Sequence, residues 1–216
     1  VGHRRLDQSV WVFQKLPSRL GWDSHNDAAM AVDAAGHLHV SGNLHVNPLV
    51  YFRTTRAGDV TSLQRVDRMV DARLEQRVTY PRFMVGPDGV LIFRYRNGSS
   101  GRGDDHYNCY DPGTSTWRAL INGPLLDGQG KMNGYFSLPE MGPDGLFHMV
   151  GVWRDTPDAA TNHDPSYARS RDLIHWEKAD GTPIPVPMSL QNIDVVERIP
   201  ARGGTVNGNC RLGFDL

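Results

Sequence analysis

The sequence has no excess of charge of either sign, because 23 Lys and Arg residues stand against 24 Asp and Glu residues. Sequence-independent binding of nucleic acid needs a basic field, which this balance does not provide. No apolar run reaches the roughly 18 residues of a membrane span, and no leader peptide is visible. We therefore expect neither nucleic acid nor a membrane as a partner, and attraction for an anionic ligand must be local.

Cysteine is scarce, since Cys109 and Cys210 are the only two. Two cysteines cannot form a disulfide scaffold, and one bridge, two free thiols or metal ligation all stay open. His106 lies three residues before Cys109, and His163 or Cys210 could join them around zinc. The spacing is loose, so His106 and Cys109 are weak metal candidates.

Acidic pairs at Asp104–Asp105 and Asp155–Asp158 could bind calcium, although solvated loop carboxylates explain them more simply. The sequence has neither a phosphate-cradling loop nor a serine-nucleophile elbow. We expect no required cofactor, with structural calcium or zinc left open.

Glycine and proline are abundant, at 23 and 14 residues, which favours short strands joined by turns. Turn glycines recur at nearly even spacing, at Gly36, Gly89 and Gly145, and each precedes a strand-like segment. Trp117 and Trp176 close two of these units. A long, regular period that holds four short strands is typical of a propeller blade.

The predicted fold is therefore all-β, a β-propeller of four-stranded blades in a single domain over residues 1–216. The repeats cover about 22–66, 79–120 and 133–180, and a fourth starts at 205–216. Three to four blades would leave open sheet edges, so we expect a fragment of a protein roughly twice as long. Helical spacing of the apolar residues between 66 and 78 predicts one short helix between blades.

Two histidines flank the first predicted hairpin, whose turn ends at Gly36. Residues 37–40 alternate in the period of a strand, so a hairpin folded at Gly36 brings His25 and His45 beside each other. His37, His39, His148 and His175 are expected to be structural.

The repeat places further polar residues at equivalent positions. His25, Tyr80 and Tyr135 each precede their own turn glycine by a similar interval. His45, Arg96 and Arg154 follow those glycines, again at similar intervals. Because inner strands of a propeller converge on its axis, these six side chains are predicted to share one funnel.

Several motifs together resemble the BNR-repeat propeller family that includes ulvan lyases, from about residue 20 to the end. They are His25-Asn26, Val32 to His45, Asn47 to Arg53, Thr79-Tyr80-Pro81, Tyr95 to Gly101 and Trp153 to Thr156. Ser170-Arg171-Asp172 with Trp176 resembles an Asp box, which stabilises a turn.

The resemblance implies a seven-bladed propeller that cleaves an acidic polysaccharide by β-elimination. It implies a secreted or periplasmic setting, and we expect a monomer. The functional positions carried over are His25, His45, Tyr80, Arg96 and Tyr135. The candidates for substrate binding are Asn26, Asn133 and Arg154.

These residue types suit elimination next to a uronic acid. Arg96 can grip and neutralise the carboxylate, with help from His45, and this makes the C5 proton acidic. Tyr80 and His25 form the proton-transfer pair in either order. Tyr135 orients the sugar or donates to the leaving oxygen, or it only packs. Arg154 contacts substrate or pairs with Asp155 or Asp158.

The sequence therefore predicts a polysaccharide lyase acting on a uronate-containing, ulvan-like polysaccharide. Two alternatives stay open: a rhamnosidase-like or sialidase-like glycoside hydrolase, and a carbohydrate-binding propeller without activity. Hydrolysis usually needs two carboxylates around the scissile bond. No Asp or Glu stands at the equivalent positions, which favours the lyase.

Overall fold

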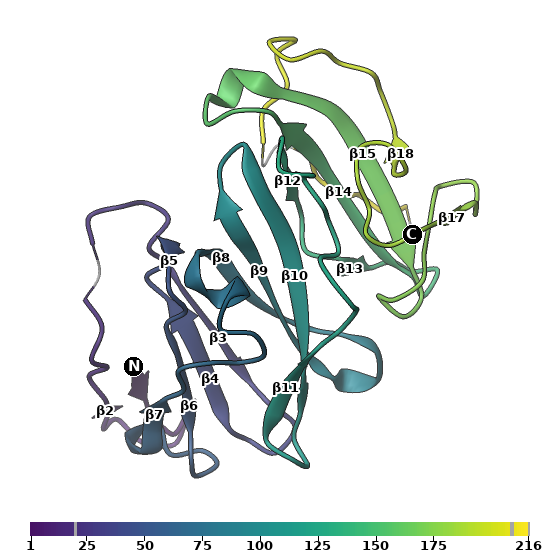
Figure 1. Ribbon diagram of the computed structural model, residues 1–216. Helices are drawn as coiled ribbons and strands as arrows, with labels where there is room; N and C mark the ends of the chain where they lie inside the picture. Colours follow the sequence, from purple (N-terminus) through teal and green to yellow (C-terminus); the bar gives the residue numbers. More distant parts are fainter. Residues whose placement is uncertain (20, 208–209, 216) are drawn as a thin grey trace. The chain divides into compact units, whose positions relative to one another are not determined.

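The computed structural model describes residues 1–19, 21–207 and 210–215, and within them the chain is all-β with four short 3-10 helices (Figure 1). None of the helices in these ranges has the length and apolar character to cross a membrane. The first strands are β1 (Gly2–His3), β2 (Val12–Phe13), β3 (Ala28–Val32), β4 (Leu38–Gly42), β5 (His45–Asn47), β6 (Tyr51–Thr54), β7 (Leu63–Arg65), β8 (Val78–Val85) and β9 (Leu91–Ser99). The later strands are β10 (Arg102–Asp111), β11 (Thr116–Ala119), β12 (Asn133–Phe136), β13 (Glu140–Met141), β14 (Phe147–Arg154), β15 (Asn162–Ser170), β16 (Trp176–Glu177), β17 (Pro183–Ile184) and β18 (Asp194–Val195). The 3-10 helices are η1 (Val60–Ser62), η2 (Leu74–Gln76), η3 (Pro87–Gly89) and η4 (Ala159–Thr161).

The described residues form a two-stranded sheet of β1 and β2 and three larger sheets. Their strand orders are β3-β4-β6-β7, then β11-β10-β9-β8-β5, then β12-β14-β15-β16-β17 with β13 on β14 and β18 on β15. The expected all-β, propeller-like class is confirmed, as a succession of sheets that are each open. The fourth repeat was expected at 205–216, where residues 208–209 and 216 lie outside the described residues and the remainder holds no strand.

The turn glycines have the backbone that their positions require. Gly36, Gly89 and Gly145 have φ angles of 83°, 76° and 76°, a region that residues with a Cβ enter at a cost. The Asp33 carboxylate accepts hydrogen bonds from the backbone N–H groups of Ala35 and His37 at 3.0 and 2.8 Å. The first turn therefore forms where the sequence places it, and β3 and β4 pair from it as a hairpin.

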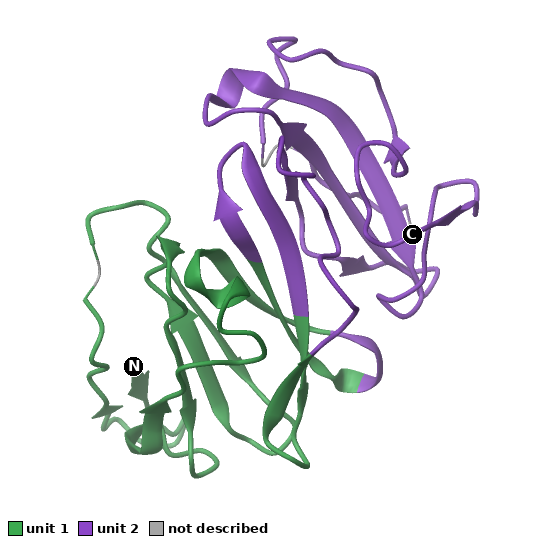
Figure 2. Cartoon of the chain, in the orientation of Figure 1, with its two compact units in different colours: residues 1–85, 89–95, 108–118 green, residues 86–88, 96–107, 119–216 purple. Residues whose placement is uncertain are grey.

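Residues 1–85, 89–95 and 108–118 form one compact unit, called unit 1, and residues 86–88, 96–107 and 119–216 form unit 2 (Figure 2). Each unit buries its own apolar residues. The largest cluster of unit 1 contains Leu44, Leu49, Tyr51, Met69, Val78, Leu91, Phe93, Tyr95, Tyr110 and Trp117. The buried residues of unit 2 include Leu125, Leu126, Phe136, Phe147, Met149, Val152, Trp153, Leu173, Trp176 and Met188.

Two histidines expected to be structural are buried against tyrosines. His39 bonds to the Tyr51 hydroxyl at 2.7 Å and to Asp33 at 3.2 Å. His148 makes the corresponding bonds to Tyr167 at 2.6 Å and to Asp144 at 2.9 Å. Both histidines stand three residues after a turn glycine, so the same polar brace recurs in two repeats. Satisfied in this way, these rings stabilise the sheets.

The short helix expected between residues 66 and 78 is limited to the three-residue 3-10 helix η2, and the rest of the segment forms a loop. Glu75, which is 2% exposed, explains the loop. Its carboxylate accepts the backbone N–H groups of Met69, Val70 and Asp71 at 2.9, 2.7 and 3.2 Å. These bonds satisfy the donors without a helix, and Met69 still reaches the core. The helical spacing of the apolar residues was therefore misleading.

We expect Glu75→Ala to lower the free energy of unfolding by about 1–3 kcal/mol, because it strands three backbone donors that the carboxylate now satisfies. Urea unfolding measures the change. Glu140→Ala is the matched control, because Glu140 is exposed. Equal stability of the two variants would contradict this role of Glu75.

Candidate functional site

A histidine cluster lies in unit 1, just before β3 and on β5. The His25 and His45 rings stack with their centroids 4.0 Å apart, and the ring of Tyr80 lies 5.6 Å from that of His25. Asp23 bonds to Nδ1 of both histidines, each at 2.6 Å. The hairpin therefore brings the two histidines together as expected, and Tyr80 of β8 joins them.

His45 lies near Tyr80 because the chain passes from the first sheet to the second between β4 and β5. β5 pairs with β8 of the second sheet, and His45 lies opposite Thr79 in this pairing. The pairing is irregular between His45 and Asn47. The Thr79 hydroxyl accepts the Val46 N–H at 2.8 Å, which holds the irregular strand in place.

The backbone around this cluster is in the left-handed region at residues other than glycine. Asn43, Val46 and Tyr80 have φ angles of 61°, 60° and 56°. For a β-branched residue such as Val46 this conformation is a true outlier. Strain of this kind persists only where surrounding contacts impose it, and it gathers at functional sites.

We expect Val46→Asn to raise the free energy of unfolding by about 0.5–1 kcal/mol, because Asn tolerates the left-handed conformation that costs valine roughly 1–2 kcal/mol. Thermal or urea unfolding measures the effect. Val85→Asn is the control, since Val85 is an exposed residue of β8 with ordinary strand geometry. A lower stability of Val46→Asn would show that Val46 is not strained.

A second cluster lies in unit 2 and gathers two arginines around one phenol. The Tyr135 hydroxyl lies 3.3 Å from Nη1 of Arg96, 3.1 Å from Nη1 of Arg154 and 2.9 Å from Oγ of Ser100. Register explains one contact, because Arg154 lies opposite Asn133 on β12 and Tyr135 is the diagonal neighbour on the same face. The guanidinium of Arg154 lies 4.2 Å from the centre of the Tyr135 ring.

This cluster shifts the acidity of Tyr135. Burial alone would raise the pKa of the phenol, but the hydrogen bond from Ser100 and the charges of Arg96 and Arg154 outweigh it. The pKa of Tyr135 therefore lies below its ordinary value of about 10. A tyrosine with a lowered pKa can act as a proton acceptor nearer to neutral pH.

Both arginines are buried, with Arg96 1% exposed and Arg154 7% exposed. Arg154 donates to Asn162 at 2.7 Å, to Ser100 at 3.2 Å, and also to Tyr135 and Asn207. All four acceptors are neutral groups, so these bonds orient the guanidinium without cancelling its charge. The alternative of an ion pair is wrong for this residue, because Asp155 pairs with His163 and Asp158 with Arg202.

The two asparagines predicted to bind substrate differ in burial. Asn133 is fully buried; its oxygen accepts the N–H of Gly101 and its amide donates to the Gly134 carbonyl. Asn133 therefore braces the loop after β9, and its contact with substrate stays a prediction. Asn26 is half-buried and donates to the Gly21 carbonyl at 3.3 Å.

The equivalent positions predicted from the repeat are only partly equivalent. Tyr80 and Tyr135 are both the third residue of their strands, whereas His25 precedes β3 by three residues. His25, His45 and Tyr80 meet in unit 1, and Arg96, Tyr135 and Arg154 meet in unit 2. Asp23 and Ser100 were missed; the only signal for Asp23 is an acidic residue two positions before His25.

One group of possible metal ligands occurs among the described residues, namely Asp23, His25 and His45, whose ligand atoms lie within 4.8 Å of one another. The expectation for His106 and Cys109 fails, because residues three apart on β10 point to opposite faces of the strand. Cys109 and Cys210 are both free thiols, and burial raises the pKa of each.

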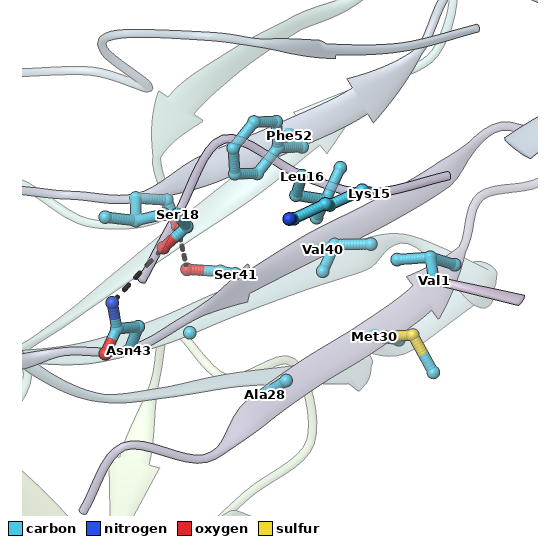
Figure 3. A pocket seen from close by; sticks show the side chains of 12 residues that line it. Val1, Lys15, Leu16, Ser18, Ala28, Met30, Val40, Ser41, Asn43 and Phe52 are labelled. Atoms are coloured by element: carbon cyan, nitrogen blue, oxygen red, sulfur yellow. Dashed lines mark hydrogen bonds between the residues drawn. The ribbon is translucent and has the colours of Figure 1, made fainter. Parts of the chain in front are cut away.

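A separate pocket of about 400 Å³ lies in unit 1 on the first sheet (Figure 3). Its walls are mainly apolar side chains such as Leu16, Met30, Val40 and Phe52, and Lys15 supplies its charged side chain. It lacks the acid–base groups of the two clusters, so the two clusters, one in each unit, are the candidate functional sites.

Residues 1–216 match the model of a family described as "BNR repeat-containing family member". No curated protein matches the sequence.

Solved structures with the same fold include the polysaccharide lyase Uly1, with a TM-score of 0.67, 21% identity and coverage of 81% of this chain and 47% of that chain. A PL25 ulvan lyase bound to -[GlcA(1-4)Rha3S]- has a TM-score of 0.63, 12% identity and coverage of 80% and 45%. An endo-arabinase from Bacteroides thetaiotaomicron has a TM-score of 0.51, 13% identity and coverage of 78% and 56%. The chain thus spans about half the length of the lyases.

Proposed function

Because the chain belongs to the BNR repeat-containing family, we propose that its protein is a carbohydrate-active enzyme and, more specifically, a polysaccharide lyase. The substrate class is a uronate-containing acidic polysaccharide of the ulvan type. The observation that carries this proposal is the pair of buried arginines, Arg96 and Arg154, that share the hydroxyl of Tyr135.

Elimination at a uronic acid has one main obstacle, which is the negative charge that develops beside the carboxylate when the C5 proton leaves. Buried, preoriented guanidinium groups stabilise such a charge far better than water does. Arg96 and Arg154 are therefore assigned to the carboxylate, with Arg154 extending the role that the sequence suggested for Arg96. The uronate of the sugar repeat bound by the similar ulvan lyase agrees with this chemistry.

Proton transfer completes the reaction. The C5–H bond breaks, its electrons form the C4–C5 double bond, and the bond from C4 to the leaving oxygen breaks. Tyr135, whose pKa the arginines and Ser100 lower, is assigned as the base. The proton that Tyr135 accepts can pass on to the leaving oxygen, which balances the reaction. For the histidine cluster of His25, His45 and Tyr80, taken by itself, we propose proton transfer to or from a bound sugar.

Glycoside hydrolysis is the second candidate function, because an endo-arabinase shares the fold. It usually requires two carboxylates around the bond. The histidine cluster contributes one, Asp23, which both histidines already engage. Arg96, Arg154 and Ser100 contact the Tyr135 hydroxyl, and none of these three residues is a carboxylate, which favours the lyase.

We place the protein outside the cell or in the periplasm, where such polysaccharides are met.

Ultraviolet absorbance during incubation with a glucuronate–rhamnose sulfate polysaccharide tests the function. Elimination creates a conjugated unsaturated uronate that absorbs, and we expect the signal to grow together with new reducing ends. Reducing ends without absorbance would identify a hydrolase. Binding without either product would identify a carbohydrate-binding protein.

A further inference from the structure

We propose that Asp23 is a positioning residue that holds His25 and His45 as a matched pair, with Nδ1 of each ring facing its carboxylate and Nε2 of each ring left for substrate. The inference rests on the proposed function, in which the two histidines serve proton transfer. Nothing in the repeat pattern or in the family resemblance marks Asp23.

Each oxygen of the Asp23 carboxylate bonds to one of the two imidazole rings. Oδ1 lies 2.6 Å from Nδ1 of His25, and Oδ2 lies 2.6 Å from Nδ1 of His45. Oδ1 also accepts the backbone N–H of His25 at 2.9 Å, which fixes the carboxylate relative to the chain. The rings stack at 4.0 Å with 20° between their planes, so one acid sets the orientation of both.

The chemistry of the acceptor determines the tautomer of each ring. An aspartate side chain is ordinarily ionised at neutral pH, and the oxygens of Asp23 lie 2.9 Å from the backbone N of His25 and 2.6 Å from Nδ1 of each ring, contacts that favour the carboxylate. A carboxylate can only accept hydrogen bonds, and each Nδ1 must therefore carry a proton. In the neutral ring this leaves a lone pair on Nε2. That arrangement is the less common tautomer of free histidine, and the structure selects it twice.

A metal ion is a weaker explanation of the same three residues. Zinc would stand about 2.0–2.2 Å from each nitrogen and oxygen, and tetrahedral ligation would separate the ligand atoms by roughly 3 Å or more. The distances of 2.6 Å from each Nδ1 to its carboxylate oxygen are those of strong hydrogen bonds instead. The left-handed backbone at Val46 and Tyr80 lies in the same cluster, and strain that surrounding contacts impose in this way gathers at functional sites.

Asp23→Asn is the decisive variant, because an amide can accept a proton from one ring only and must donate to the other. Asp67→Asn is the matched control with the same change of charge, since the Asp67 side chain is 93% exposed. Nitrogen–proton correlation spectra of the imidazoles report the tautomers in the protein without substrate. Thermal unfolding of both variants checks that they fold.

We expect both histidines to carry the proton on Nδ1 in the wild type and in Asp67→Asn, and one of them to switch to Nε2 in Asp23→Asn. Turnover of Asp23→Asn should fall roughly 10–100-fold with KM almost unchanged, the range typical of losing a group that orients functional side chains. In Asp23→Ala neither imidazole has the carboxylate as an acceptor, so both histidines should exchange between their two tautomers.

Unchanged tautomers in Asp23→Asn would overturn the proposal, as would stoichiometric zinc binding that Asp23→Asn abolishes. The spectra do not depend on any glycan. If the tautomers behave as expected but no unsaturated product forms, the lyase function fails while the role of Asp23 in holding the rings stands.

Discussion

Arg96→Gln is expected to reduce turnover on a uronate-containing polysaccharide by about 10²–10³-fold, the usual loss when one preoriented donor to a developing charge is removed. Arg96 is 1% exposed and its Nη1 lies 3.3 Å from the Tyr135 hydroxyl, so bulk water has no access with which to replace the guanidinium. Initial rates of unsaturated product measure the effect.

Two comparisons separate catalysis from folding in this experiment. Arg171→Gln removes an exposed arginine and should leave turnover within error of the wild type. Arg96→Lys keeps the charge but loses the two parallel donors, and should recover only part of the rate. Arg96→Gln with normal thermal unfolding and near wild-type turnover would exclude Arg96 from the reaction.

The second large effect is on the pH dependence of the rate. Tyr135 acts as a base only as its anion, so the rate rises with pH until its pKa is passed. Arg154 favours the anion from 3.1 Å, and Arg154→Gln should raise that pKa. The acidic limb of the pH–rate profile should move to higher pH with it, and Tyr135→Phe should remove that limb.

Ser100→Ala should shift the same limb in the same direction, because the hydrogen bond from Ser100 also lowers the pKa of Tyr135. Arg171→Gln again serves as the control for Arg154→Gln, because it loses the same charge at an exposed position. A profile that both Arg154→Gln and Ser100→Ala leave in place would assign the base to another residue, with Tyr80 the first alternative.

Much of the fold could be predicted because turn chemistry is local. Gly36, Gly89 and Gly145 occupy conformations that disfavour other residues, so their spacing reveals the repeat from the sequence alone. The loop at 66–78 could not be predicted in the same way. Its apolar spacing fits a helix, and only the buried carboxylate of Glu75, acting on three backbone donors, stabilises the loop instead.

The sequence was enough to predict which residues belong to the candidate sites, but not most of the contacts between them. The hairpin was enough to pair His25 with His45, because both residues flank one turn. The passage of β5 to the second sheet, which brings His45 to Tyr80, depends on the pairing of His45 with Thr79, and these two positions are far apart in the sequence. The roles of Asp23 and Ser100 are set by such tertiary contacts, and short polar residues near turns are too common to be noticed.

Cleavage in heavy-oxygen water, followed by mass spectrometry of the fragments, tests the proposed chemistry most directly. Elimination breaks the bond without adding water across it, so the primary fragments should carry an unsaturated uronate and no heavy oxygen beyond that exchanged in controls. One heavy oxygen fixed at each cleaved bond, on saturated sugars, would show hydrolysis and contradict a lyase built on Arg96, Arg154 and Tyr135.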